Sequence, residues 1–255
     1  MFPVIPIGPL LFQTAGLVLV LSLWLGSTLA EREARRLGVQ ASFINSGMFV
    51  AVIAGLLGAR LAYVARYLST YLANPASVLS LSTSALVAPA GVVTGVLSAG
   101  FYWWLKRMPL RQTLDAITPL LAVLAIGLGG AHLAAGNAFG APSRVPWAIY
   151  LWEEYRHPSQ VYEIVAATFV FALAWRVRTC SPFAGFPFLL WLTTSAAARL
   201  LLESYRGDSV FVLGGLRAAQ LAALGVLILG LWLVGRWARA GLVHAQAEDL
   251  WETTG

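Results

Sequence analysis

The chain has 255 residues, of which 59% are hydrophobic and 11% charged, with a mean hydropathy of +0.75. Soluble domains carry about a quarter charged residues, so this composition excludes a soluble globular protein and predicts an all-α integral membrane protein. The net charge is +6, from 16 arginines and one lysine against 11 acidic residues, and the cations are found in short loops between apolar segments. These cations are interpreted as topology signals, and nucleic acid is not expected as a partner.

The apolar segments divide the chain into seven predicted transmembrane helices. Met1 to Ile7 has no positive n-region, and the apolar segment behind it is long enough to span, so no cleavable signal peptide is expected. The spans cover approximately residues 8–30, 43–64, 85–105, 114–135, 158–175, 183–202 and 216–234. Residues 65–84 are too polar to span and are predicted to be interfacial. We expect one seven-helix domain over residues 1–235 and a polar cytoplasmic tail over residues 236–255.

Seven spans put the two termini on opposite sides of the membrane. Ten cations fall on one side, at positions Arg32, Arg35, Arg36, Lys106, Arg107, Arg111, Arg176, Arg178, Arg236 and Arg239. The positive-inside bias places this side in the cytoplasm. The prediction is an outside N-terminus and a cytoplasmic C-terminus in a multi-pass plasma-membrane protein.

The sixth predicted span ends in alternating charges. Arg199 and Glu203 are four residues apart and Arg206 is three further on, so one helix face would carry plus, minus, plus. Charges within a bilayer cost about 2.5–3.5 kcal/mol each on insertion scales, so these side chains should face the bundle interior. They indicate either an ion pair that fixes helix packing or a phosphate site, since arginine binds phosphate oxygens bidentately. Arg60, with Tyr63 and Tyr67 on its face, is either an interface anchor or a ligand residue.

A second polar stretch, residues 156–163, begins the fifth predicted span. Pro158 favours a helix start, and Gln160 and Glu163 share a helix face beside His157. These groups indicate either an anchor at the membrane interface or a ligand site. His132, the one imidazole within a span, is either a hydrogen-bonded packing residue or a base. Three predicted helices thus bring polar groups towards the outer leaflet, which favours an amphiphilic substrate such as a phospholipid.

Cysteine and histidine offer no metal chemistry. Cys180 is alone, so neither a disulfide framework nor a thiolate metal cluster is expected. The three histidines have no acidic neighbours at ligand spacing. No metal and no cofactor are predicted.

Residues 157–163, His-Pro-Ser-Gln-Val-Tyr-Glu, resemble a motif of the prolipoprotein diacylglyceryl transferase family almost letter for letter. Residues 3–9, 58–64 and 199–206 also resemble segments of that family, and Gln220 stands where the family keeps a glutamine. The resemblance implies transfer of diacylglycerol from phosphatidylglycerol to the lipobox cysteine of a prolipoprotein, with release of glycerol 1-phosphate. Phosphatidylglycerol, the prolipoprotein signal segment and the membrane are then the partners.

The resemblance also implies roles for single residues. Arg199 and Arg206 would hold phosphate, with Glu203 orienting them, and Arg60 would serve the lipid head group. His157, Gln160 and Glu163 would shape the outer mouth. Catalysis is assigned to Arg199, Glu203 and His132, and substrate binding to Arg60, Gly140, His157, Gln160, Glu163 and Arg206.

The family signature Arg-x-Gly-Asn-Phe-x-Asn-x-Glu-x-x-Gly is only partly present. Its arginine falls on Gly129, its first asparagine on His132, its second on Ala135 and its glutamate on Asn137, while Gly140 is kept. The family's histidine before the third span corresponds to Pro89, and tyrosines correspond to Ala15 and Ser195. His132 and Asn137 are possible substitutes. The alternative function is a non-catalytic relative that binds phospholipid or a lipoprotein segment; a transporter is less favoured, since matched broken helices are absent.

Overall fold

The computed structural model describes residues 4–7, 10–73, 85–212 and 214–254. It divides into two compact units, Met1–Glu33 with Leu114–Gly255, and Ala34–Thr113. We refer to them as the large and the small unit and describe each by itself.

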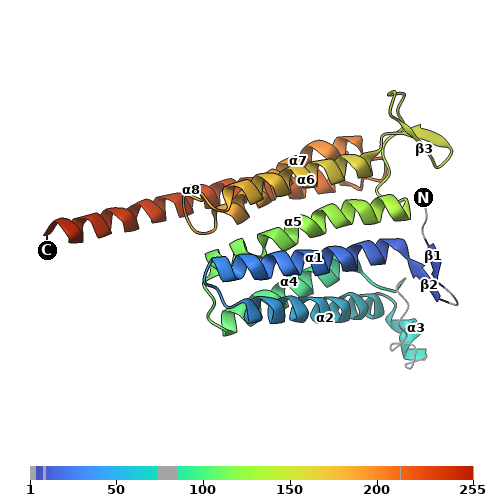
Figure 1. The fold of residues 1–255 in the computed structure, drawn as a ribbon. Coiled ribbons are helices and arrows are strands. Elements are labelled where there is room, and N and C mark those ends of the chain that lie inside the picture. Colours follow the sequence, from blue (N-terminus) through green and yellow to red (C-terminus); the bar gives the residue numbers. More distant parts are fainter. Residues whose placement is uncertain (1–3, 8–9, 74–84, 213, 255) are drawn as a thin grey trace. The chain divides into compact units, whose positions relative to one another are not determined.

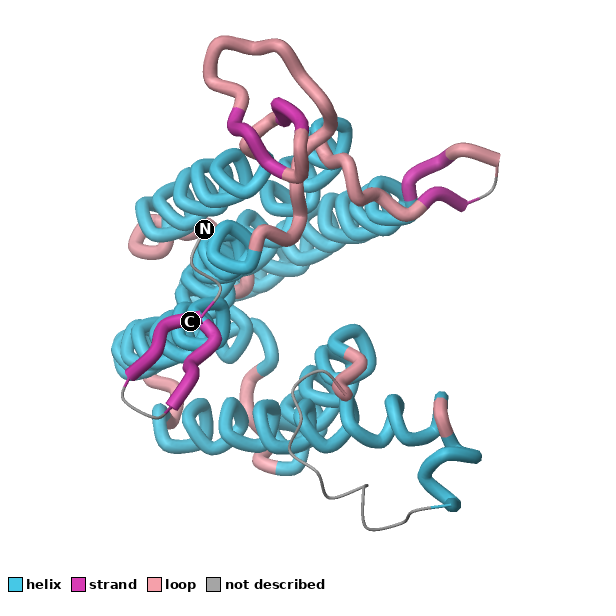
Figure 2. Tube along the Cα trace, turned by 90° about the vertical axis from the view of Figure 1, so that its right-hand side faces the viewer, coloured by secondary structure: helices cyan, strands magenta, loops and turns pink. Residues whose placement is uncertain are grey.

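Helices dominate both units (Figure 1). The large unit holds most of α1 (Thr14–Arg36) and α5 (Leu110–Ala135), and all of α6 (Ser159–Val177), α7 (Phe186–Leu202), the 3₁₀ turn η2 (Glu203–Tyr205) and α8 (Ala218–Thr254). It also holds three antiparallel hairpins, drawn in magenta in Figure 2: β1–β2 (Val4–Ile7, Leu10–Gln13), β3–β4 (Ile149–Leu151, Glu154–Arg156) and β5–β6 (Phe211–Val212, Leu216–Arg217). The small unit holds α2 (Ala41–Arg66), α3 (Leu68–Ala73) and α4 (Ala88–Leu105).

Five of these helices have the length and hydropathy needed to cross a membrane. They are α1, α2, α5, α6 and the Ala218–Ala240 part of α8. Many large apolar side chains on them are exposed, among them Leu21 and Leu57, as expected of surfaces that face lipid rather than water. The prediction of a mostly helical, multi-pass membrane protein is therefore confirmed. The count of seven spans and their orientation stay predictions.

The two ends of the first predicted span lie elsewhere than expected. Residues 8–13 were predicted to begin a helix, but Leu10–Gln13 pairs as a strand with Val4–Ile7, and α1 starts at Thr14. Residues 31–36 were predicted to be a charged loop, but they continue α1 to Arg36. The helix tolerates these charges because Glu33 is buried and paired with Arg178.

Two other predicted segments differ or are only partly described. Of the predicted interfacial segment, Leu68–Ala73 forms α3, and residues 74–84 lie outside the described residues. The helix of the seventh predicted span does not stop at residue 234 but runs to Thr254 as α8, so the predicted tail begins inside a helix.

Helix α5 is the centre of the large unit. In the most apolar stretch of α5, 56% of the residues are buried, against 11–17% in the other four candidate spans. Small residues let its neighbours approach: a Cβ on Gly26 of α1 would lie 2.8 Å from Leu120 Cδ1, and one on Gly129 of α5 would lie 2.8 Å from Ile164 Cγ1 of α6. In membranes such close backbone packing replaces the hydrophobic drive that associates helices in water.

The small unit is a close pair of α2 and α4. A Cβ on Gly91 would lie 2.8 Å from the carbonyl oxygen of Gly55, and one on Gly95 equally close to that of Ala51. Near the end of α2, Arg60 donates from Nη1 to the carbonyl oxygen of Ala85 at 3.1 Å, and its guanidinium lies 5.5 Å from the ring centre of Tyr71. Arg60 is thus held within its own unit by an oxygen and an aromatic face.

Candidate functional site

A cavity of about 150 Å³ opens between α5, α6 and α7 of the large unit. Most of its wall is formed by residues with apolar or small side chains, namely Ala125, Leu128, Gly129, Ala166, Ala167, Val170, Ser195, Ala198 and Leu202. The remaining lining residues are His132 from α5, Glu163 from α6 and Arg199 from α7. The cavity is therefore an apolar groove with an imidazole, a carboxylate and a guanidinium in its wall. A cavity of this size accommodates one small ring-sized molecule, so it suits the polar reacting part of a lipid but not its acyl chains.

Glu163 joins the three helices. Its Oε1 accepts hydrogen bonds from Arg199 Nη1 at 2.9 Å and from Arg206 Nη1 at 2.7 Å, and its Oε2 lies 2.9 Å from His132 Nδ1. Both carboxylate oxygens are thus engaged, by cations on one side and by the imidazole on the other. The prediction made Glu163 one residue of an outer mouth. In the structure Glu163 is the central residue, or hub, of the polar site, because it contacts all three of these side chains. The spacing of residues within α6 could not indicate this role.

Glu203 forms a second, deeper layer beneath Arg199. The carboxylate is 1% exposed, its Oε2 lies 2.8 Å from Arg199 Nη2, and its Oε1 accepts from the Ser209 hydroxyl at 2.7 Å. Arg217 also donates to the Glu203 carbonyl oxygen. Arg199 therefore forms ion pairs with two carboxylates, and 38% of its side chain is still exposed. The ion pair of Arg199 with Glu203, one of the two alternatives that the sequence left open, is present in the structure.

Arg206 lies outside helix α7, contrary to the predicted helix face of alternating charges. The helix ends at Leu202 and Arg206 has an extended backbone. Its Nε and Nη2 donate to Asp208 at 2.9 and 2.8 Å, whereas Glu203 is 3.9 Å away. Burial lowers the pKa of Arg206, but the hydrogen bond with Asp208 and the nearby carboxylates raise it by more, so its pKa lies above its usual range. Arg206 does not line the cavity and is only 11% exposed.

The remaining predicted residues of the large unit build a junction of three backbone segments. Gly140 forms a bridge with Arg206, and a Cβ on Gly140 would collide with the His157 carbonyl oxygen. The His157 amide in turn donates to the Ala141 carbonyl oxygen at 3.0 Å. Gln160 is fully buried and donates from Nε2 to the Asn137 carbonyl oxygen at 2.9 Å. None of these side chains lines the cavity. They hold the loop after α5 against the start of α6 and the end of η2.

The structure thus sorts the nine predicted site residues into groups. His132, Glu163 and Arg199 line the cavity, Glu203 and Arg206 contact them, and Gly140, His157 and Gln160 form the junction. Arg60 belongs to the small unit. Asn137, proposed as a substitute, has an exposed side chain outside the cavity lining, whereas Gln220 donates to the carbonyl oxygen of Leu200 at 3.1 Å.

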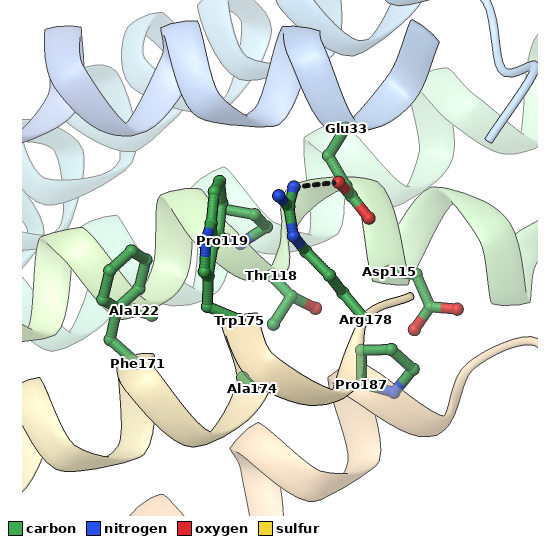
Figure 3. A pocket seen from close by; sticks show the side chains of 10 residues that line it. All are labelled: Glu33, Asp115, Thr118, Pro119, Ala122, Phe171, Ala174, Trp175, Arg178 and Pro187. Atoms are coloured by element: carbon green, nitrogen blue, oxygen red, sulfur yellow. Dashed lines mark hydrogen bonds and ion pairs between the residues drawn. The ribbon is translucent and has the colours of Figure 1, made fainter. Parts of the chain in front are cut away.

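Four charged residues that form polar contacts, Asp208, Asp115, Glu33 and Arg178, were not predicted to do so. Asp208, two residues after Arg206, is the chelating partner of that arginine. At the start of α5, Asp115 is 4% exposed and accepts from the amides of Gly185 and Phe188 at the start of α7, at 2.6 and 3.1 Å. A pocket of about 10 Å³ beside it contains Glu33 and Arg178 (Figure 3). An acid at position 115 of an otherwise apolar span was the signal that could have revealed this second cluster.

In this second cluster Arg178 lies between Glu33 and Trp175. Its guanidinium sits 3.5 Å from the ring centre of Trp175 and donates from Nη1 to Glu33 Oε2 at 2.9 Å (Figure 3). Aromatic stacking and a buried carboxylate together offset the cost of desolvating the cation. With only about 10 Å³ of free space, the cluster is a packed joint between α1 and α6.

Comparisons with known proteins show the family of the chain. The family model described as prolipoprotein diacylglyceryl transferase matches residues 3–236. Similar proteins named phosphatidylglycerol–prolipoprotein diacylglyceryl transferase include one from Symbiobacterium thermophilum, 31% identical over 93% of this chain and 94% of its own length. One from Trichormus variabilis is 30% identical over 91% of this chain and 89% of its length, and one from Clostridioides difficile is 27% identical over 85% and 87%. With a family match across nearly all of its length and relatives at 30% identity or more, the chain belongs to the prolipoprotein diacylglyceryl transferase family.

Proposed function

We propose that this protein transfers the diacylglyceryl group of phosphatidylglycerol to a prolipoprotein in lipoprotein biogenesis. The observation that carries the proposal is the apolar cavity with Arg199, Glu163 and His132 in its wall, in a chain of the diacylglyceryl transferase family. The acceptor is the lipobox cysteine thiol in the signal segment of the prolipoprotein. The reaction takes place near the outer leaflet of a bacterial plasma membrane, in a bundle of seven spans with the N-terminus outside.

The alternation of ends in the large unit supports this topology. Arg178 after α6 meets Glu33 near the end of α1, and the start of α5 meets the start of α7 through Asp115. His132 near the end of α5, Glu163 near the start of α6 and Arg199 near the end of α7 lie together at the other ends of these helices. The arginine-rich ends and the cavity ends therefore point in opposite directions, as a cytoplasmic and an outer face require.

Arg199 is assigned the phosphate group. It is the arginine of the cluster that lines the cavity, and its exposed part gives an anion access to a guanidinium already oriented by Glu163 and Glu203. A fixed cation stabilises the charge that develops on the departing phosphate oxygen without reorganising during the reaction. Arg206 and Glu203 act from behind as positioning residues. Gly140, His157 and Gln160 act on substrate binding by holding the loops at the cavity, and Arg60 serves the lipid head group.

The transfer balances without a cofactor. The thiol sulfur forms a bond to the glycerol carbon next to the phosphate, and the bond between that carbon and the phosphate oxygen breaks. The electron pair stays on the oxygen, so glycerol 1-phosphate leaves, and the thiol proton goes to a base. The nucleophile belongs to the substrate, so the chain needs no reactive cysteine of its own.

The test is turnover by the purified full chain with phosphatidylglycerol and a lipobox peptide. Mass spectrometry should find the diacylglyceryl thioether, and glycerol phosphate should appear in equal amount. Arg199→Ala should lower turnover about 10²–10³-fold, as does loss of one preorganised charge stabiliser. Thr168→Val is the matched control, because Thr168 is an exposed residue of α6 that bonds only its own helix backbone. Saturable phosphatidylglycerol binding without thioether would overturn the proposal in favour of a non-catalytic lipid-binding relative.

A further inference from the structure

The imidazole of His132 has one nitrogen held and the other free. Nδ1 lies 2.9 Å from Glu163 Oε2, and Nε2 has no hydrogen-bond partner among the described residues. The ring lines the cavity with 24% of its side chain exposed. A histidine that serves packing is expected to have both nitrogens satisfied or buried in apolar contact. His132 instead has a polar atom without a partner among the described residues, and its ring lines a space large enough for a substrate group.

Glu163 sets which nitrogen carries the proton. A carboxylate accepts but does not donate, so a neutral imidazole beside it keeps its proton on Nδ1, and Nε2 becomes the proton acceptor. The carboxylate cannot turn away from the ring, since its other oxygen is bonded to Arg199 at 2.9 Å and Arg206 at 2.7 Å. The charged groups around the imidazole are therefore Glu163 from α6 and, through it, Arg199 from α7 and Arg206. This arrangement fixes both the tautomer and the direction of the ring.

We infer that His132, held by Glu163, is the general base that removes the proton from the acceptor thiol. The inference rests on the proposed transferase function and deepens it. Nε2 takes the thiol proton as the sulfur bonds to the glycerol carbon, and the imidazolium later returns that proton to the departing glycerol phosphate or to water. His132 is then a catalytic residue and Glu163 a positioning residue that also stabilises the imidazolium.

This base does not stand where the motif of the family has its histidine. His132 occupies the place of the first asparagine in the family signature, and Pro89 the place of the family's histidine before the third span. The base and its orienting carboxylate lie on two packed helices of one unit, α5 and α6. Arg199, which we assign to the phosphate, lines the same cavity. One cavity thus supplies a proton acceptor for the nucleophile and a cation for the leaving group.

The decisive variant is His132→Asn, because asparagine can still donate a hydrogen bond to Glu163 but has no basic nitrogen. We expect turnover of the lipobox peptide to fall about 10²–10⁴-fold, the usual contribution of a general base. The KM for phosphatidylglycerol and the melting temperature in detergent should stay close to those of the unchanged protein. Thr168→Val serves again as the control.

A peptide with selenocysteine in place of the lipobox cysteine separates catalysis from structure. A selenol is already ionised at neutral pH and needs no base, so it should recover most of the rate that His132→Asn loses with the thiol. A structural defect would slow both peptides equally.

Each outcome has one meaning. Full turnover of the cysteine peptide by His132→Asn, or an equal loss with both peptides, would overturn the dyad and leave the transferase function standing. A wild-type protein that forms neither the thioether nor the selenoether would reject the transferase function itself. Loss with the thiol and rescue by the selenol would together support His132 as the base.

Discussion

Arg178 and Glu33 form an ion pair, with Nη1 2.9 Å from Oε2, that ties the end of α6 to the last turns of α1. Glu33 is 2% exposed. Removing one partner of a buried pair leaves an uncompensated charge, at a cost of about 3 kcal/mol or more. We expect Glu33→Gln to lower the melting temperature in detergent clearly, and Arg32→Gln, a change at an exposed neighbour, to leave it almost unchanged. Equal melting of both variants would contradict this role of the pair.

Asp115 should stabilise α7 although it belongs to α5. Its carboxylate accepts hydrogen bonds from the amides of Gly185 and Phe188, which start α7 and have no partner within that helix. Losing such a cap costs about 0.5–2 kcal/mol. Asp115→Ala should therefore speed hydrogen exchange at these two amides, while Asp115→Asn, which keeps an acceptor oxygen, should preserve most of the protection. Unchanged exchange in Asp115→Ala would refute the cap.

Gly140 should not accept even a methyl group. Its Cβ would collide with the His157 carbonyl oxygen, and the adjoining amide of Gly207 donates to the Phe139 carbonyl oxygen at 2.9 Å, so three backbones meet there. Gly140→Ala should separate these segments and reduce both turnover and the melting temperature. Gly225→Ala is the matched control, since nothing lies within 4 Å of a Cβ at that helical position. It should be neutral or stabilise by about 1 kcal/mol.

Arg206 should not be replaceable by lysine. The planar guanidinium chelates Asp208 and reaches Glu163 with a third nitrogen, a geometry that an ammonium cannot reproduce. Arg206→Lys should therefore loosen Glu163 and, with it, His132 and Arg199. Turnover is expected to fall about 10-fold or more, because a hydrogen bond to a charged group, such as that from Arg206 to Glu163, contributes about 1.5–3 kcal/mol. A fully active Arg206→Lys enzyme would exclude the positioning role.

The contribution of Arg206 to the stability of the folded protein should not change between neutral and moderately alkaline pH. Its pKa is raised in the folded protein, so its stabilising contribution is present below the unfolded pKa and is lost only above the folded one. Arginine stays protonated throughout the accessible pH range, so this contribution should be constant between about pH 7 and 10. In Arg206→Lys an ammonium titrating near about 10.4 replaces it. Measured by thermal melting, the variant should lose this contribution as the pH rises past about 10.4, whereas the unchanged protein should keep it there.

Local composition predicted the helical segments but not how they end. Runs of about 20 apolar residues placed α2, α5 and α6 within a few residues, because a bilayer demands that length whatever the neighbours. The start of α1 and the charged stretch after residue 30 were wrong. There the outcome depended on strand pairing of Val4–Ile7 and on Arg178, which lies 145 residues from its partner Glu33.

The polar residues of the site were recognisable one by one from the sequence, because charges in apolar spans are costly and the motif at residues 157–163 is specific. Their division of labour was not. Glu163 bonds to His132, Arg199 and Arg206 from three separate segments, and Gln160, on the same helix face, is buried against a loop. Spacing along one helix reports which side chains share a face, but only packing between helices decides which of them meet a partner, line the cavity or keep a nitrogen free for chemistry.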